Sequence, residues 1–159
     1  MKNLYYYDFT VCSLGIAEDS GAITEIFFND KKAAKKDRRE YRLTETPLIM
    51  ETRRQLDEYF SKKRRDFDLP LSLRGTGFQL SVWEALRAIP YGTTCSYLDV
   101  AAKIGSPKAC RAVGMANNRN PVVIVVPCHR VIGKNKSLTG YGGGLELKKY
   151  LLELEKGVV

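Results

Sequence analysis

The sequence predicts an α/β domain over residues 1–72 and a mostly helical domain over residues 73–159. Three observations predict this division. The first third alternates apolar and polar residues with the period of strands. The second half has helix-capping residues followed by apolar positions at helical spacing. Between them, Asp68-Leu69-Pro70 and Arg74-Gly75-Thr76-Gly77 break both patterns and mark a linker near residues 70–76.

The N-terminal domain is expected to begin with strands joined by a hairpin turn at Asp19–Gly21. The three expected strands are Leu4–Cys12, Leu14–Glu18 and Ala22–Phe28. The highly charged segment Lys31–Arg42 is expected to be an exposed loop or a frayed helix. A helix is then expected over Thr46–Phe60, whose apolar residues can share one face.

The C-terminal domain is expected to contain a helix-turn-helix. Thr76 can cap a first helix, and Ser96 can cap a short second helix that Gly105 stops. Ser106 and Pro107 are expected to start the next helix, with Ser as the cap and Pro in the first turn. Two short helices joined by a Gly-containing turn are typical of DNA-binding proteins.

The helix that is expected to start at Ser106 and Pro107 is the second helix of the helix-turn-helix, and it has few groups that could read bases. Lys108, Arg111 and Met115 are expected to share a face, and their neighbours are nearly all small. Those neighbours are Ala109, Cys110, Ala112, Gly114 and Ala116. Small side chains let a helix backbone approach a groove closely, so this pattern favours binding by shape and backbone over base-edge readout. The alternative is that the alanines simply pack this helix against its neighbour.

The net charge of +8 is concentrated in the second half of the chain. Residues 1–72 carry 14 basic and 13 acidic side chains, whereas residues 73–159 carry 12 basic and 5 acidic ones. A surface with this bias attracts a polyanion such as DNA. The alternative is a solvated basic face that only keeps the protein in solution.

Composition argues against several other classes of protein. The four cysteines lie far apart with no C-x-x-C pair, and there is one His, so neither a zinc site nor a disulfide framework is expected. No apolar run has the length of a signal core or a membrane span, so a cytoplasmic protein with reduced thiols is expected.

One short motif, Pro127-Cys128-His129-Arg130-Val131, carries the strongest chemical signal. It follows the apolar run Val122–Val126, which is expected to be a buried strand bounded by prolines. The motif therefore places a thiol at a strand end, next to the single histidine. A nearby base can raise the thiolate fraction, which makes Cys128 a candidate nucleophile. The alternative is a buried structural cysteine beside a surface histidine.

These features together resemble the O6-alkylguanine-DNA alkyltransferases from about residue 75 to the C-terminus. The shared residues are Gly75-Thr76, Phe78-Gln79, Val82-Trp83, Ile89–Gly92, Ser96-Tyr97, Ala109–Gly114, Asn120-Pro121, Pro127–Val131 and Tyr141–Gly144. The resemblance implies a ribonuclease-H-like α/β fold for the N-terminal domain. It implies a mostly helical fold, similar to a winged helix-turn-helix, for the C-terminal domain.

The resemblance also implies a reaction. Members of this family move an alkyl group from guanine O6, and from thymine O4, in duplex DNA to their own cysteine, once per molecule, and the transfer itself needs no cofactor and no metal. In this sequence Cys128 matches the nucleophile and His129 the base that takes its proton through a water. Glu155 matches the acid that orients the imidazole, and Asn120 matches an asparagine that holds the active-site turn. The zinc ligands of some members are missing here.

On the DNA side, Tyr97 matches the tyrosine that pushes the damaged nucleotide out, and Arg111 matches the arginine that replaces it in the base stack. The implied partner is double-stranded DNA containing O6-alkylguanine, bound through the minor groove by a monomer. The other implied DNA-binding residues are Lys108, Ala109 and Ala112, and the implied pocket residues are Val131, Tyr141 and Gly142. Many members have Ser where this chain has Gly142, so one contact to guanine is expected to differ.

Three other functions fit parts of the sequence. A non-catalytic protein that binds alkylated bases would share the fold but lack the cysteine. A helix-turn-helix regulator would leave Cys128 unexplained and would need more base-reading groups. A Cys-His peptidase usually has its two residues far apart in sequence.

Overall fold

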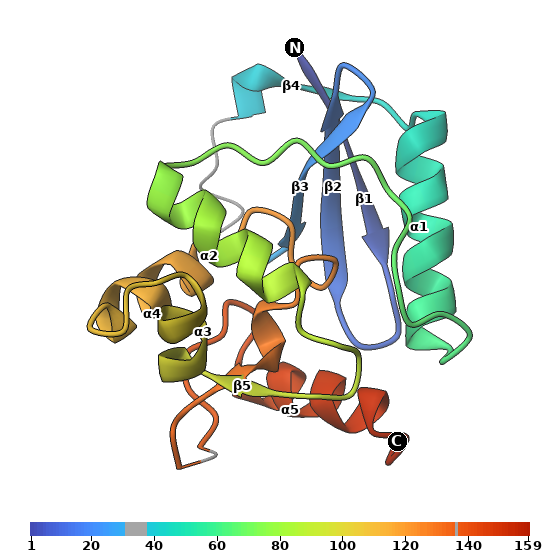
Figure 1. The fold of residues 1–159 in the computed structure, drawn as a ribbon. Coiled ribbons are helices and arrows are strands. Elements are labelled where there is room, and N and C mark those ends of the chain that lie inside the picture. The colour runs from blue at the N-terminus through green and yellow to red at the C-terminus, as the bar shows by residue number, and fades with distance from the viewer. Residues whose placement is uncertain (31–37, 136) are drawn as a thin grey trace. The chain divides into compact units, whose positions relative to one another are not determined.

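The computed structural model describes residues 1–30, 38–135 and 137–159. They form two compact units. The first unit contains Met1–Leu73 and Pro121–Val123, and the second contains Arg74–Asn120 and Ile124–Val159. The first unit carries a four-stranded sheet and the second is mostly helical (Figure 1), so the coarse division that the sequence predicts is confirmed.

The sheet of the first unit has the strand order β3-β2-β1-β4. Its strands are β1 (Lys2–Asp8), β2 (Ser13–Asp19), β3 (Ala22–Phe28) and β4 (Tyr41–Leu43). β1 and β3 both pair antiparallel with β2, while β4 pairs parallel with β1. The predicted hairpin turn is confirmed, since Ser20 and Gly21 have φ angles of 53° and 81° between two antiparallel strands.

One prediction for this unit is wrong, and a second is wrong at the C-terminal end of its segment. The first strand ends at Asp8 and not at Cys12, because a turn begins where the Phe9 amide bonds to the Cys12 carbonyl at 2.8 Å. The segment Lys31–Arg42 was expected to be a loop or a frayed helix. Its residues 31–37 lie outside the described part of the chain, but η2 (Arg38–Glu40) and then β4 follow. Pairing with the distant β1 overrides the charged composition of this segment.

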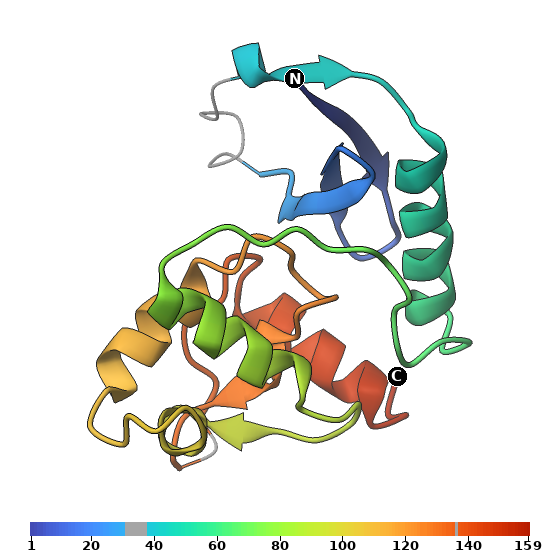
Figure 2. The same cartoon turned by 45° about the horizontal axis from the view of Figure 1, so that its top comes forward.

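One helix, α1 (Pro47–Phe60), packs on the sheet (Figure 2). The helix expected over Thr46–Phe60 is thus present, and Thr46 caps it, with its hydroxyl accepting a hydrogen bond from the Ile49 amide at 3.2 Å. The apolar face contributes Ile49, Leu56 and Tyr59, all fully buried, to the core of this unit.

The outer edge of β3 bonds to two further segments of the same unit. Ile23 forms a parallel bridge with Leu71, and Ile26 forms one with Val122. The Ile26 amide donates to Pro121 at 2.9 Å, and the Val123 amide donates to Ile26 at 3.0 Å. These bonds satisfy backbone groups that an open edge would leave exposed, and they explain why residues 121–123 belong to the first unit.

The described residues of the second unit include four α-helices and a two-stranded parallel sheet. The helices are α2 (Gly77–Arg87), α3 (Tyr97–Lys103), α4 (Cys110–Asn118) and α5 (Leu145–Glu155). The strands β5 (Cys95–Ser96) and β6 (Val131–Ile132) pair with each other. Thr76 and Ser96 form capping boxes at the starts of α2 and α3, so both predicted helix starts are confirmed.

The predicted start of α4 is wrong. α4 begins at Cys110 and not near Ser106, because Ser106 belongs to the end of α3. There the Ser106 amide bonds to the Ala101 carbonyl at 2.9 Å and the Gly105 amide to the Ala102 carbonyl at 3.1 Å. This is a Schellman motif, with Gly105 at a φ angle of 77°. Lys108 therefore lies in the connecting turn and does not share a helical face with Arg111, as was expected.

The buried strand expected over Val122–Val126 is also absent. Val122 and Val123 bond to β3, but a turn follows, and Ile124 has a φ angle of 72°. The segment is buried as expected, with Val122 and Val126 both at 0% exposure. An apolar run predicts burial but cannot by itself distinguish a strand from a buried turn.

No helix among the described residues has both the length and the apolar content needed to cross a membrane. The same residues contain no group of three or more His, Cys, Asp or Glu side chains that could hold a metal ion.

Candidate active site

A buried turn positions Cys128 at the start of the 3-10 helix η3 (Cys128–Arg130). The thiol residue is only 4% exposed, and its amide donates to the Val126 carbonyl at 2.8 Å. The preceding Ile124 has a left-handed backbone, which is rare and strained for a β-branched residue. The candidate nucleophile is thus held by a specific turn and not by the end of a regular strand.

Four N–H groups converge on the carboxylate of Glu155 near the C-terminus of α5. His129 Nε2 lies 2.6 Å from Oε2, and the Gly92 amide donates to Oε1 at 3.2 Å. Arg130 donates from Nε to Oε1 at 2.8 Å and from Nη2 to Oε2 at 3.0 Å. The three side chains are all buried. We call Gly92, His129, Arg130 and Glu155 the carboxylate cluster.

Two asparagines near the end of α4 bond to the turn that carries the thiol. Asn120 Nδ2 donates to the Val126 carbonyl at 2.7 Å, and Asn117 Nδ2 lies 3.4 Å from the Cys128 carbonyl. Both side chains are buried. Asn120 and Asn117 therefore both bond to the turn that carries the thiol, and Asn117 is a contact that sequence reasoning missed.

Tyr97 is the first residue of α3, and its hydroxyl lies 3.0 Å from the hydroxyl of Thr139. Gly114 of α4 lies beside the same ring, since a Cβ built there would be 3.9 Å from it. The predicted pocket residues Tyr141 and Gly142 lie in the loop before α5, half-buried and exposed respectively.

The loop before α5 is anchored by Lys148. Its ammonium donates to the Val131 carbonyl at 2.6 Å and to the Thr139 carbonyl at 2.8 Å. Lys148 itself has 0% exposure. We call Lys148 and these two carbonyls the lysine site.

The predicted DNA-binding residues lie around the N-terminus of α4. Arg111 and Ala112 are exposed on its first turns. Lys108 is exposed and Ala109 half-buried in the turn just before it. Small and basic groups are therefore presented together, as a surface for close approach to a phosphate backbone requires.

Two family models match almost the whole chain. The model described as 6-O-methylguanine DNA methyltransferase, DNA binding domain, matches residues 77–157. The model described as 6-O-methylguanine DNA methyltransferase, ribonuclease-like domain, matches residues 4–73. The chain belongs to the 6-O-methylguanine DNA methyltransferase family.

Similar proteins agree with this membership. The chain is 49% identical over 157 residues, 95% of each protein, to the constitutive methylated-DNA–protein-cysteine methyltransferase of Bacillus subtilis. It is 58% identical over 108 residues to the methylated-DNA–protein-cysteine methyltransferase of Methanosarcina acetivorans, covering 68% of this chain and 69% of that one. The crystal structure of Mycobacterium tuberculosis OGT in complex with DNA matches with a TM-score of 0.90 and 42% identity, covering 98% of this chain and 94% of the other.

In this family member the thiol needs help to ionise. Burial raises the pKa of Cys128 to about 11, although a hydrogen bond from Asn120 and the positive charge of Lys148 act in the opposite direction. A thiol with such a pKa is thiolate in only about one molecule in 10⁴ at neutral pH. A base that removes the proton as the thiol reacts is therefore required.

The carboxylate cluster leaves one nitrogen of His129 available for this task. Burial lowers the pKa of His129 despite the neighbouring Glu155, so the neutral imidazole is favoured. With Nε2–H donating to Glu155, Nδ1 carries the lone pair. Nδ1 is buried and bonds to no described protein atom. Burial opposes the ionisation of Glu155 too, but hydrogen bonds from His129 and Arg130 lower the pKa of that carboxyl to about 2.

Sequence reasoning did not assign roles to Arg130 and Lys148. Arg130 lies inside the Pro127–Val131 motif, where Cys128 and His129 carry the more evident catalytic chemistry. Lys148 lies two turns before Glu155 on α5, so helical spacing already places it on the buried face of that helix. A lysine on a buried helical face was the available signal, because lysines are rarely fully buried unless the ammonium has a partner.

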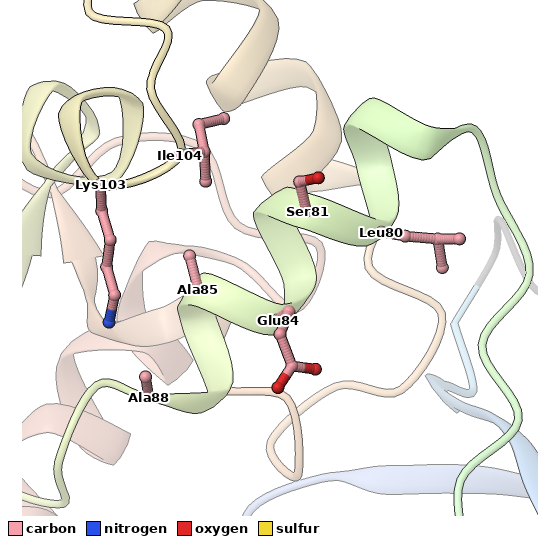
Figure 3. Close-up of a pocket in the computed structure, with 7 residues that line it drawn as sticks. All are labelled: Leu80, Ser81, Glu84, Ala85, Ala88, Lys103 and Ile104. Carbon is pink, nitrogen blue, oxygen red and sulfur yellow. The ribbon is translucent and has the colours of Figure 1, made fainter.

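A separate groove lies between α2 and α3 (Figure 3). Its volume is about 630 Å³, and its lining is mostly small or apolar, with Glu84 and Lys103 as the charged groups. The lining includes none of the predicted site residues, so the groove is not part of the candidate active site.

Proposed function

We propose that this protein repairs O6-alkylguanine in duplex DNA by transferring the alkyl group to the sulfur of Cys128, once per molecule. The observation that carries the proposal is a buried thiol directly before the histidine of the carboxylate cluster, in a member of this family. The names of the relatives from B. subtilis and M. acetivorans support alkyl transfer from DNA to a cysteine.

His129 acts as the base in the proposed reaction. Glu155 holds the imidazole through Nε2 at 2.6 Å, and Arg130 and Gly92 fix the carboxylate. Nδ1 takes the thiol proton through a water, because adjacent side chains cannot easily meet directly. The developing imidazolium is stabilised by the carboxylate, as in an acid-base-nucleophile triad.

The transfer step is a displacement at the saturated carbon of the alkyl group. The S–C bond forms as the C–O6 bond breaks, and the electron pair of that bond passes to the guanine. The proton of Cys128 moves to His129 and from there to the released base, so the products are neutral guanine and a thioether. The thioether is stable, which makes the reaction single-turnover.

The target atom is unreachable inside the duplex, so the proposal includes base extrusion. Tyr97 displaces the nucleotide and donates a hydrogen bond to the guanine as it leaves, while Arg111 fills the space in the stack. Lys108, Ala109 and Ala112 approach the minor groove, where small side chains permit close contact. A relative of 42% identity has been solved in complex with DNA, which supports DNA binding by this protein.

Val131, Tyr141 and Gly142 form the proposed pocket for the alkylated base, including the smaller O4-alkylthymine. We further propose that the protein acts as a cytoplasmic monomer without cofactor or metal, and that residues 1–72 and 73–159 are its two domains. In this proposal residues 1–72 have a ribonuclease-H-like fold, and residues 73–159 have a fold similar to a winged helix-turn-helix.

Mass spectrometry after incubation with duplex DNA containing O6-methylguanine tests the central claim. One methylene is expected on the peptide that carries Cys128 and none on Cys12, Cys95 or Cys110. Cys128→Ser is the control that should stay unlabelled while still binding the duplex, with an affinity that falls as salt rises. An unchanged mass, or a label on another cysteine, contradicts the proposal.

A further inference from the structure

Thr139 connects two functional parts of the second unit. Its backbone carbonyl accepts a hydrogen bond from the buried ammonium of Lys148 at 2.8 Å. Its side-chain hydroxyl lies 3.0 Å from the hydroxyl of Tyr97, which is 42 residues away in sequence. The residue that is proposed to act on the damaged nucleotide is therefore bonded to a loop that Lys148 holds in place.

The backbone of Thr139 is well anchored even though its side chain is exposed. Lys148 has 0% exposure and also bonds to the Val131 carbonyl at 2.6 Å, directly after η3. An ammonium bonded to two backbone carbonyls fixes the loop relative to the turn that carries the thiol. The hydroxyl of Thr139 is thus presented to Tyr97 from a defined position.

Either hydroxyl can be the donor in this contact. A phenol has one O–H to donate and can also accept, and a threonine hydroxyl has the same capacity. When Thr139 donates to the Tyr97 oxygen, the phenol O–H stays available for a ring nitrogen of the base. A donor whose oxygen already accepts a hydrogen bond is polarised and donates more strongly.

We propose that Thr139 is a positioning residue that orients and polarises the Tyr97 hydroxyl toward the extruded base. This inference rests on the proposed function of Tyr97. It adds a residue outside the set predicted from the sequence, and it assigns a role to Lys148, which holds the carbonyl of Thr139.

The test measures the single-turnover rate constant for alkyl transfer from duplex O6-methylguanine DNA and from free O6-benzylguanine. Thr139→Val, which removes the hydroxyl but keeps the shape, is expected to lower the rate with duplex DNA about 3- to 10-fold, the range of one hydrogen bond. Thr139→Ser keeps the hydroxyl and is expected to stay within about 2-fold of the parent protein. Thr10→Val, the same exchange at an exposed position of the first unit, is the matched control and should change neither rate.

A double-mutant cycle with Tyr97→Phe separates positioning from a structural effect. Once the phenol hydroxyl is gone, Thr139→Val should cause no further loss with either substrate, and thermal unfolding should be unchanged. The inference is overturned if Thr139→Val reacts like the parent protein, if Thr139→Ser is equally slow, or if the loss is undiminished beside Tyr97→Phe.

These outcomes differ from a failure of the proposed function itself. A parent protein that leaves Cys128 unlabelled would refute alkyl transfer. A Tyr97→Phe variant that reacts at the parent rate would refute the role of Tyr97, and the inference about Thr139 with it. A slow Tyr97→Phe variant beside an unaffected Thr139→Val variant would refute only the inference.

Discussion

The carboxylate cluster and the lysine site each bury a cation in the second unit, but they treat its charge differently. Arg130 makes two hydrogen bonds to Glu155, and its remaining Nη1 donates to the Ile89 carbonyl at 2.7 Å. Lys148 bonds to two backbone carbonyls, and no carboxylate among the described residues pairs with its ammonium. One cation is neutralised by a partner, and the other is not.

This difference predicts different roles for the two cations. The charge of Arg130 is cancelled locally, so its main effect is to hold Glu155 ionised and oriented toward His129. Burial lowers the pKa of Lys148, and the charge that remains acts on its surroundings, including the thiol of Cys128, whose pKa it lowers. The carboxylate cluster therefore controls the base, while the lysine site controls the nucleophile and the loop.

The largest effect is expected from Glu155→Gln. This change leaves the buried guanidinium of Arg130 without its counter-charge, which typically costs about 3–5 kcal/mol of the free energy of unfolding. It also removes the carboxylate that orients His129, so alkyl transfer should slow by about 10²-fold or more. Urea unfolding and single-turnover kinetics measure the two effects.

Glu153→Gln is the matched control on the same helix. Glu153 is partly exposed, and its ion pair with Lys149 spans 3.9 Å at the surface. Its loss should change stability by no more than about 0.5 kcal/mol. Equal effects from the two exchanges would refute the distinction between a buried cluster and a surface pair.

Acid pH should lower the free energy of unfolding through the same cluster, without any mutation. The pKa of Glu155 in the folded protein is about 2, against an ordinary value of 4.5. The stabilising contribution of this carboxylate is therefore complete above pH 4.5 and is lost as the pH falls toward 2. This shift corresponds to a loss of about 3 kcal/mol. Because the pKa of His129 is also lowered, from its ordinary value of 6.5, protonation of this imidazole reduces stability as well, beginning as the pH falls below 6.5.

Urea unfolding across this pH range measures the loss. Glu155→Gln should show a flatter curve over the acid part, because the group that titrates there is gone. A parent protein whose stability is constant from neutral to acid pH would contradict the proposed state of the cluster.

A smaller effect is expected at the lysine site from Lys148→Met. Two backbone carbonyls lose their donor, which should cost about 1–3 kcal/mol. The thiol also loses a nearby positive charge, so its pKa should rise further. Iodoacetamide labelling of Cys128 across neutral to alkaline pH measures this shift, with Lys149→Met, an exposed neighbour, as the control. An unchanged pH profile would mean that Lys148 serves the loop alone.

Sequence patterns were most reliable where the decisive contacts are local. Thr76 and Ser96 each cap a helix through a bond to a residue three positions away, and both caps were predicted. The same local reasoning failed for α4, because Ser106 bonds backward to Ala101 and completes the preceding helix. Local signals are ambiguous when one residue can serve either of two neighbouring helices.

Predictions that depend on distant partners were weaker. The apolar run Val122–Val126 correctly predicted burial, but only pairing with Ile26 and the left-handed Ile124 decided that it forms a turn. The strand β4 was missed because its partner β1 lies about 40 residues earlier, beyond any local pattern.

By itself, the sequence determined the two-part division of the chain, the adjacency of Cys128 and His129, and the family resemblance that singled out Glu155. Only the tertiary structure decided what surrounds these residues. It added Arg130 and Gly92 to the carboxylate of Glu155, placed Lys148 under the loop before α5, and brought Thr139 to Tyr97. The physical reason is that burial and hydrogen bonds between distant residues set the charge and orientation of a side chain, and these exist only in the folded chain.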